Sequence, residues 1–328
     1  MSGYIIIDGN SIGFAAQAST RLSVGGQETQ AIFGTLRTVR AIRQSRPDLT
    51  PIVCWDGVSW RKDVYPQYKA HRDKEATSKH AVAMQAARAA FKTQRPHIAQ
   101  ALKHLGVAQF SALNMEADDL AAILVARYRP LGKKLLLVSG DKDWLQLIGP
   151  RTVWFDPIRD HRVSPAGFQE FTGLANVRQL VELKALVGEA GDLGPGSGVG
   201  GIGDKTAREI LSRFGSVNSL CNLWIEGRID AVTGVVAGVD PAAFKCSAKV
   251  RDFLDETKPG RAIFARNLRL IDLNTRERPA PYGPKLVKGR FDRAAFTDIC
   301  DRFAFKSILK EFDAWVEPFD PALKEIAA

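Results

Sequence analysis

The chain has 328 residues, a length typical of about two domains, and its 45% hydrophobic and 25% charged residues exclude a disordered, collagen-like or coiled-coil protein. Lys and Arg outnumber Asp and Glu by 46 to 36, and the net charge of +10 favours a polyanionic partner such as nucleic acid or an acidic membrane surface. The apolar runs are too short to span a bilayer, the N-terminus lacks a signal-peptide pattern, and the four cysteines form no CxxC pair. We therefore expect an intracellular protein without a zinc module or a disulfide framework.

Four short apolar runs in the first half are each followed by an aspartate. The runs are Tyr4–Ile7, Ile52–Trp55, Leu135–Val138 and Val153–Phe155, and the aspartates are Asp8, Asp56, Asp141 and Asp156. Such runs are typical of strands buried on both faces, and the helical patterns between them predict a parallel α/β sheet. Ligands of these sheets bind beyond the carboxyl ends of the strands, so several of the carboxylates are expected in one crevice. For any single aspartate, a turn or a helix cap is the simpler interpretation.

Residues 60–95 form a polar, basic insertion with few large aliphatic side chains. Its cationic residues are Arg61, Lys62, Lys69, Arg72, Lys74, Lys79, Arg88, Lys92 and Arg95. A segment with so little apolar surface is expected to project from the sheet and to order on binding; the alternative is a solvated helical hairpin without a role. Amphipathic helices are predicted after it, over 97–105 and 116–128.

The second half contains a helical pattern over 177–187 and then a glycine-rich segment over 188–203. So much glycine predicts tight turns with exposed backbone amides. Helical periodicity resumes at Lys205, and most of the remaining chain is helical in pattern. The segment is not a P-loop, because Asp204 separates its last glycine from Lys205-Thr206. We expect the turn and helix start at Gly201, Gly203, Lys205 and Thr206 to bind a phosphate of a polyanion such as nucleic acid; an ordinary helix start is the alternative.

Seven acidic residues are expected to converge at the carboxyl edge of the sheet: Asp8, Asp56, Glu116, Asp118, Asp119, Asp141 and Asp143. Mutual repulsion disfavours the ionisation of all of them, and folding tolerates such a cluster when cations fill it. Ligand sets made only of oxygen select hard ions such as Mg²⁺ or Mn²⁺. Two such ions about 4 Å apart would activate a water and stabilise the leaving oxygen of a phosphodiester.

Six motifs occur in the order found in the 5′ nuclease family, which includes flap endonucleases, the 5′ nuclease domain of bacterial DNA polymerase I and stand-alone bacteriophage exonucleases. They are Ile7–Asn10, Tyr68–Arg72, Glu116–Asp119, Ser139–Asp143, Gly201–Ala207 and Arg266–Leu273. The chain resembles this family to about residue 310. Because its length leaves no room for a polymerase domain, it is similar to the stand-alone enzymes of phage or prophage type.

The resemblance implies an α/β class fold: a PIN-like parallel-sheet core over 1–185 with a basic helical arch at about 60–95, then a helix-three-turn-helix region over 186–328 that grips duplex DNA. It implies a divalent-metal-dependent 5′-3′ exonuclease and flap endonuclease. Its substrates would be DNA with 5′ flaps, nicks or free 5′ ends, and RNA–DNA hybrids. A monomer in the bacterial cytoplasm or in a phage-infected cell is expected.

The resemblance also assigns residues. Asp8, Asp56, Glu116, Asp118 and Asp119 match the first set of metal-site carboxylates, and Asp141 and Asp143 join the second. Lys69 and Arg72 match residues that contact the scissile phosphate. The expected catalytic residues are these two and Asp141. Tyr68 is expected to stack on the terminal base. The glycine turn is expected to hold K⁺ through its carbonyls.

One segment departs from the family pattern. The family's Gly-Asp-x-x-Asp-Asn reads Gly188-Glu189-Ala190-Gly191-Asp192-Leu193 in this sequence. Asp192 fits as a metal ligand, whereas the longer Glu189 side chain fits less well. With these two residues the proposed metal ligands number nine. The rest of the chain then has 27 acidic residues and 46 basic ones. This cationic surplus is expected to make DNA binding strongly dependent on salt.

Two other functions remain open from the sequence. One is a ribonuclease of the PIN or RNase H-like type, although such domains are usually shorter and lack the basic insertion and the glycine hairpin. The other is a DNA-binding protein of the same fold without catalysis. A binding protein gains nothing from seven carboxylates beside a polyanion, so the acidic set favours the nuclease.

Overall fold

The computed structural model describes residues 3–70 and 78–320, apart from the side chain of His80. Contacts divide the chain into two compact units. We call the first the sheet unit, which comprises Met1–Ser59, Glu75–Pro165 and Pro279–Ala328, and the second the helical unit, which comprises Trp60–Lys74 and Ala166–Arg278. The division predicted at residues 185 and 186 falls inside a helix of the helical unit, Val177–Val187.

The sheet unit is built on one mixed, mostly parallel sheet of seven strands with the order β8-β7-β6-β1-β4-β5-β9. The strands are β1 (Gly3–Asp8), β4 (Leu49–Trp55), β5 (Ala108–Ser111), β6 (Lys134–Val138), β7 (Thr152–Asp156), β8 (His161–Val163) and β9 (Lys285–Val287). The four predicted strands are confirmed as β1, β4, β6 and β7, which pair in parallel. The edge strands β8 and β9 are antiparallel.

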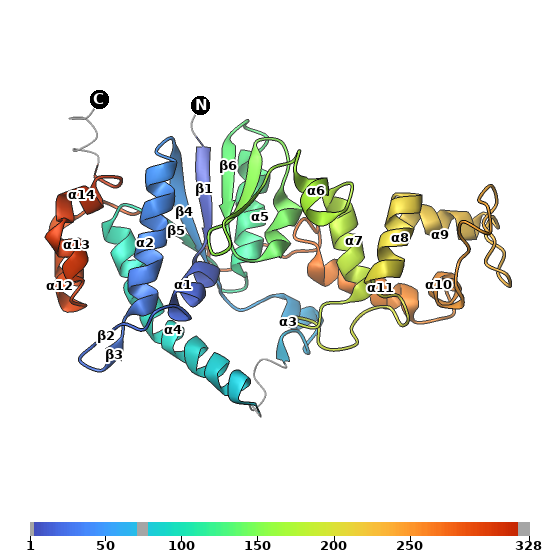
Figure 1. The fold of residues 1–328 in the computed structure, drawn as a ribbon, viewed down its shortest axis with the longest axis horizontal. Helices are drawn as coiled ribbons and strands as arrows, with labels where there is room; N and C mark the ends of the chain where they lie inside the picture. Colours follow the sequence, from blue (N-terminus) through green and yellow to red (C-terminus); the bar gives the residue numbers. More distant parts are fainter. Residues whose placement is uncertain (1–2, 71–77, 321–328) are drawn as a thin grey trace. The chain divides into compact units, whose positions relative to one another are not determined.

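The chain reverses its direction across the sheet between β1 and β6. The helices α1 (Gly9–Gln17), α2 (Gln30–Ser45) and α4 (Lys79–His104) follow β1 and β4, whereas α5 (Ala117–Tyr128) connects β5 back to β6. Right-handed crossovers place these two groups of helices on opposite faces, as Figure 1 shows. Ligands of such sheets bind beyond the carboxyl ends of the strands at the point of reversal, which here lies at β1 and β6. A small ribbon, β2 (Ser23–Val24) and β3 (Gln27–Glu28), links α1 to α2.

The helix α4 is continuous over two segments that were predicted to be separate. These are the alanine-rich second half of the insertion and the helix over 97–105. The helix α4 runs through Pro96 without ending, although proline removes one backbone hydrogen bond from a helix. Most side chains before Phe91 are half-exposed or exposed, whereas Ile98, Ala101 and Leu102 are fully buried. The first half of α4 therefore projects from the sheet (Figure 1), as expected of a segment with few apolar residues.

The last helices belong to the sheet unit. These are α12 (Arg293–Arg302), α13 (Lys306–Lys310) and α14 (Phe312–Val316). Their buried side chains, among them Phe296, Ile299 and Ile308, join the same core as Leu102 of α4 and Val39 of α2. The predicted assignment of these helices to a second, DNA-binding region therefore differs from the packing, because their aromatic residues complete the core beside the sheet.

The helical unit contains α3 (Arg61–Val64), α6 (Phe168–Thr172), α7 (Val177–Val187), α8 (Asp204–Phe214), α9 (Val217–Ile225), α10 (Ala248–Leu254) and α11 (Gly260–Ile271). Its helix α7 packs against α8 and α11, and the predicted helices over 177–187 and from 205 are confirmed as α7 and α8. Among the helices in the described part of the chain, none combines the length and the apolar character needed to cross a bilayer. A short 3₁₀ helix, η2 (Lys142–Leu147), belongs to the sheet unit.

Candidate active site

Asp8 lies at the carboxyl end of the central strand β1 and caps the N-terminus of α1. Its Oδ1 accepts a hydrogen bond from the Ser11 amide at 2.9 Å, and its Oδ2 accepts one from the Ser139 hydroxyl at 2.8 Å. The side chain is almost fully buried, with 5% of its surface exposed. The end of the apolar strand therefore holds a carboxylate inside the protein, fixed on both oxygens.

Asp56 follows the neighbouring strand β4 and points toward the start of α5. Its Oδ1 accepts a hydrogen bond from the Ala117 amide at 2.7 Å, and its own amide donates to Asn10 Oδ1 at 3.3 Å. Arg95 of α4 donates to the Asp56 carbonyl at 2.8 Å. These contacts join the segments that follow β1 and β4 to the helix on the opposite face of the sheet.

The first turn of α5 supplies three carboxylates. Glu116 and Asp119 form a capping box, in which Asp119 Oδ2 accepts from the Glu116 amide at 3.2 Å. Glu116 Oε2 also accepts from the Ser59 hydroxyl at 3.0 Å, while Asp118 Oδ1 accepts from Trp144 Nε1 at 2.6 Å. Asp119 is fully buried, and its hydrogen bond to the Glu116 amide stabilises the helix start.

Asp141 and Asp143 lie where β6 passes into η2. Asp141 caps this short helix by accepting from the Asp143 amide at 2.8 Å, and the Asp141 side chain is exposed. The Asp141 amide donates at 3.0 Å to the hydroxyl of the fully buried Ser139, which itself donates to Asp8. Ser139 thus connects the carboxylate of β1 with the loop that carries Asp141.

The electrostatics of this cluster disfavour its full ionisation. Burial first and the neighbouring Asp56 second raise the pKa of Asp8 to about 7, with a further contribution from Asp141. Burial also raises the pKa of the Cys54 thiol well above its usual value, and the charges of Asp8, Asp118 and Asp56 add to this shift. Asp56 and Asp141 thus lie near enough to Asp8 to disfavour its ionisation, and a cation would relieve this repulsion.

Within the described ranges, no group of three or more Asp, Glu, His or Cys side chains is arranged so that it could hold a metal ion. Asp8, Asp56 and Asp118 instead hold N–H and O–H donors of the protein. The donor set still fits a hard divalent cation, because it consists of carboxylate oxygens beside a buried carboxyl whose pKa is raised. A bound ion would have to replace some of these protein donors.

Asp156 is not among the seven acidic residues expected at the site, and it has a structural role. It is fully buried at the end of β7 and accepts from the Ile158 amide at 2.9 Å and from Arg159 Nη1 at 2.8 Å. Asp156 therefore organises the turn between β7 and β8.

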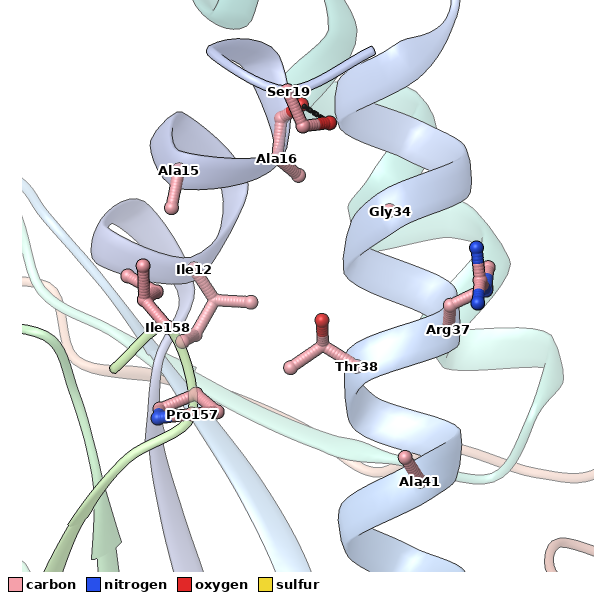
Figure 2. Close-up of a pocket in the computed structure, with 10 residues that line it drawn as sticks. All are labelled: Ile12, Ala15, Ala16, Ser19, Gly34, Arg37, Thr38, Ala41, Pro157 and Ile158. Carbon is pink, nitrogen blue, oxygen red and sulfur yellow. Dashed lines mark hydrogen bonds between the residues drawn. The ribbon is translucent and has the colours of Figure 1, made fainter. Parts of the chain in front are cut away.

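A hollow of about 370 Å³ lies between α1, α2 and this turn, as Figure 2 shows. Its lining includes Ile12 and Ile158 and contains no carboxylate. Gly140 keeps the nearby backbone close, because a Cβ there would meet Ile158 at 2.9 Å and Ser11 at 3.2 Å. The hollow thus borders the carboxylate cluster without containing it.

In the helical unit, Tyr68 and Lys69 both contact Asp192. The Tyr68 hydroxyl donates to Asp192 Oδ2 at 3.0 Å, and Lys69 Nζ lies 3.4 Å from the same oxygen. The Tyr68 ring is 3% exposed and packs in a small core with Val181 and Leu270, so it offers no free face to a base in this conformation. Arg72 lies outside the described residues.

Glu189 forms an ion pair with Lys184 at 2.6 Å, so the residue that departs from the family pattern has a partner on α7. The glycines around it permit a very close turn. Gly188 has a φ of +82°, and a Cβ there would lie 2.2 Å from the Gly198 amide nitrogen. The side chain of Asn267 fixes the turn by donating to the carbonyls of Ala185 at 2.8 Å and Ser197 at 2.9 Å.

The predicted DNA-binding turn lies at the N-terminus of α8. Gly203 is the residue before the helix, and it is exposed together with Gly201 and Lys205, whereas Thr206 is partly buried. Gly201 has a φ of +78° and lies against Lys249 of α10. The structure therefore places backbone amides and a lysine together on the surface of the helical unit.

Several residues that position the cluster were not singled out from the sequence: Asn10, Ser11, Ser59, Ser139 and Trp144. Asn10 and Ser139 lie inside the motifs that carry the family resemblance, and this was the available signal. Ser59 and Trp144 have no distinguishing pattern, because their partners Glu116 and Asp118 are distant in sequence. Ser11 lies three residues after Asp8 and donates to it as part of a local helix cap.

The family model described as 5′-3′ exonuclease, N-terminal resolvase-like domain, matches residues 3–173. A 5′-3′ exonuclease of Aquifex aeolicus is 31% identical over 229 residues, which cover 68% of this chain and 74% of that protein. DNA polymerase I of Mycobacterium tuberculosis is 28% identical over 310 residues, which cover 91% of this chain. These residues are 31% of the polymerase, so this chain spans about a third of that relative's length.

Solved structures share the fold. The bacteriophage T5 D15 flap endonuclease in complex with DNA and metal ions has a TM-score of 0.63 and 23% identity, covering 96% of this chain and 99% of that one. The catalytic core of Rad2 with a DNA substrate has a TM-score of 0.54 and 15% identity, covering 97% and 93%. The family match over more than half of the sequence, together with the Aquifex relative, confirms the resemblance inferred from the motifs, and the chain belongs to the 5′-3′ exonuclease family.

Proposed function

We propose that the chain hydrolyses DNA phosphodiesters near 5′ ends, as a 5′-3′ exonuclease and flap endonuclease that depends on divalent metal ions. The observation that carries this proposal is the row of carboxylates at the carboxyl edge of the sheet, in a member of this family. Asp8 is central to that row because its buried carboxyl has a pKa near 7. Solved relatives that contain DNA and metal ions support the same function.

Mg²⁺ or Mn²⁺ is the proposed cofactor, with two or more ions. Bound ions would activate a water and stabilise the leaving oxygen. The first ligand set is Asp8, Asp56, Glu116, Asp118 and Asp119, and the second includes Asp141, Asp143 and Asp192. Glu189 would act through a water, since it is paired with Lys184. The Ser11 amide and the Ser139 hydroxyl orient Asp8 for this role.

DNA with flaps, nicks or free 5′ ends is the proposed substrate. We assign Lys69 and Arg72 to the phosphate that is cut, and the turn at Gly201 and Gly203 with Lys205 and Thr206 to a phosphate of the duplex. K⁺ at the turn carbonyls is part of the same proposal. Exposed amides at the start of an α-helix favour an anion, which supports the second assignment.

Cleavage of a 5′-labelled flap duplex tests the function. With Mg²⁺ we expect short labelled products from the wild type, none with EDTA, and a rate reduced by at least about a hundredfold in Asp141→Asn because a charged ligand is lost. DNA affinity in Ca²⁺ should be nearly unchanged in this variant. Full activity of Asp141→Asn, or activity in EDTA, would refute the proposal.

Two lysine variants separate catalysis from binding. Lys69→Ala should mainly slow single-turnover cleavage at saturating enzyme, because its charge acts on the phosphate that is cut. Lys205→Glu should instead weaken binding and reduce the salt dependence of the affinity by about one charge. If both variants change both measurements equally, the division of roles is incorrect.

The raised pKa of Asp8 predicts how the free energy of unfolding depends on pH. Its native pKa of about 7 lies above the ordinary value of 3.8, so the native state keeps a proton that the unfolded state has lost. In EDTA, the contribution of Asp8 to the free energy of unfolding should fall as pH rises from about 4 to about 7 and then stay constant. Thermal melts of Asp8→Asn should lack this part of the decline.

Mg²⁺ provides the matching measurement. At pH 8 it should raise the melting temperature of the wild type, because it binds the native state preferentially. Mg²⁺ should raise the melting temperature of Asp8→Asn much less. Equal Mg²⁺ responses in the two proteins would contradict the role of Asp8 as a ligand.

A further inference from the structure

A second hollow lies at the edge of the sheet opposite to the carboxylates, and its volume is about 350 Å³. Leu49 and Lys134, which line it, begin β4 and β6 and pair with Gly3 at the start of β1. Asp8 ends that strand. At about 3.3 Å per residue, the length of β1 separates the hollow from Asp8 by roughly 16 Å. The hollow is thus distinct from the candidate active site.

Among the described residues, four cationic side chains line this hollow and no acidic residue does. They are Arg46 directly after α2, Lys134 in β6, Arg151 directly before β7 and Arg162 in β8. Asp48, outside the lining, pairs with Arg46 at 3.2 Å and lies 4.0 Å from Lys134. Within the described residues, the Arg162 guanidinium has no hydrogen-bond or ion-pair partner. An anion placed here would gain attraction from several cations at once.

The floor of the hollow is apolar. Leu49 and Leu136 are 1% and 4% exposed, and Val153 beside them is partly exposed. A hollow of this size accepts a single large apolar group. A DNA duplex offers phosphates to such a surface but keeps its bases stacked inside, so it would leave the apolar floor unused. A peptide that carries carboxylates on both sides of an apolar side chain matches both the charge and the floor.

We propose that this hollow docks an acidic peptide segment of a partner protein. The carboxylates of the segment bind the four cations, and one large apolar side chain lies on Leu49, Leu136 and Val153. This proposal does not depend on the nuclease function, because neither the hollow nor its lining includes a residue assigned to cleavage.

Fluorescence anisotropy with a labelled peptide, Asp-Asp-Phe-Asp-Asp, tests the proposal on the full chain. We expect saturable binding that weakens as salt is added, and a loss of about tenfold or more in affinity for Lys134→Glu/Arg162→Glu, since two attractions become repulsions. The matched control is Lys288→Glu, an exposed lysine after β9 at the other end of the sheet, which should bind as the wild type does. Replacing the peptide phenylalanine by serine should also weaken binding.

Binding to the wild type and binding to the double variant can each overturn the proposal. Absence of peptide binding to the wild type, or unchanged affinity in the double variant, would refute it. If a labelled oligothymidylate binds the wild type more tightly than the peptide and loses affinity in the double variant, the hollow binds nucleic acid and not protein. Flap cleavage by the double variant should equal that of the wild type, and this assay reports on the proposed nuclease function separately.

Discussion

The repulsion among carboxylates at the carboxyl end of β1 is the interaction on which the proposed chemistry depends. Asp8 is buried at the end of an apolar strand, where loss of solvent and the charge of Asp56 raise its pKa to about 7. The protein compensates with two donors, the Ser11 amide and the Ser139 hydroxyl. These donors hold the carboxyl in place but do not remove the repulsion, which a divalent cation would relieve if it replaced some of them.

The topology of the sheet explains why the charges gather there. The parallel strands β1, β4 and β6 end at one edge, and the chain reverses direction between β1 and β6. The ends of these strands therefore carry Asp8, Asp56 and Asp141 to the same edge of the sheet, where Asp56 and Asp141 influence Asp8. The start of α5, held by Asp56 through the Ala117 amide, adds its own carboxylates. Burial of the strands thus fixes the positions of charged groups that have no apolar driving force of their own.

The sequence predicted the parts that have strong local patterns. Continuous apolar runs predicted β1, β4, β6 and β7, and helical periodicity predicted α5, α7 and α8. It did not predict β5, a strand of four residues in which the buried Gln109 interrupts the apolar pattern. The buried amide of Gln109 finds its hydrogen-bond partners in other segments of the chain. Its Oε1 accepts from Trp55 Nε1 at 2.8 Å, and its Nε2 donates to the Ala99 carbonyl at 2.8 Å. The continuity of α4 through Pro96 also depends on tertiary packing, which overrides local preference.

The site divides in the same way. Residue type and family motif indicated the carboxylates, whereas their hydrogen-bond partners Ser59, Ser139 and Trp144 depended on contacts between distant segments. The burial of Tyr68 was equally hidden, because its partners Val181 and Leu270 follow more than 100 residues later in the chain. The local sequence identifies side chains whose chemistry suits catalysis or binding. Packing determines which of these side chains are accessible to a ligand.

Anomalous diffraction from crystals grown with Mn²⁺ tests the central claim most directly, because it locates the ion independently of activity. We predict an anomalous peak within ligand distance of Asp8 and at least one of Asp56 and Asp141, with the Asp8 carboxylate in the inner coordination sphere. The absence of Mn²⁺ from this crevice at saturating concentration, or its presence only elsewhere on the molecule, would contradict the account.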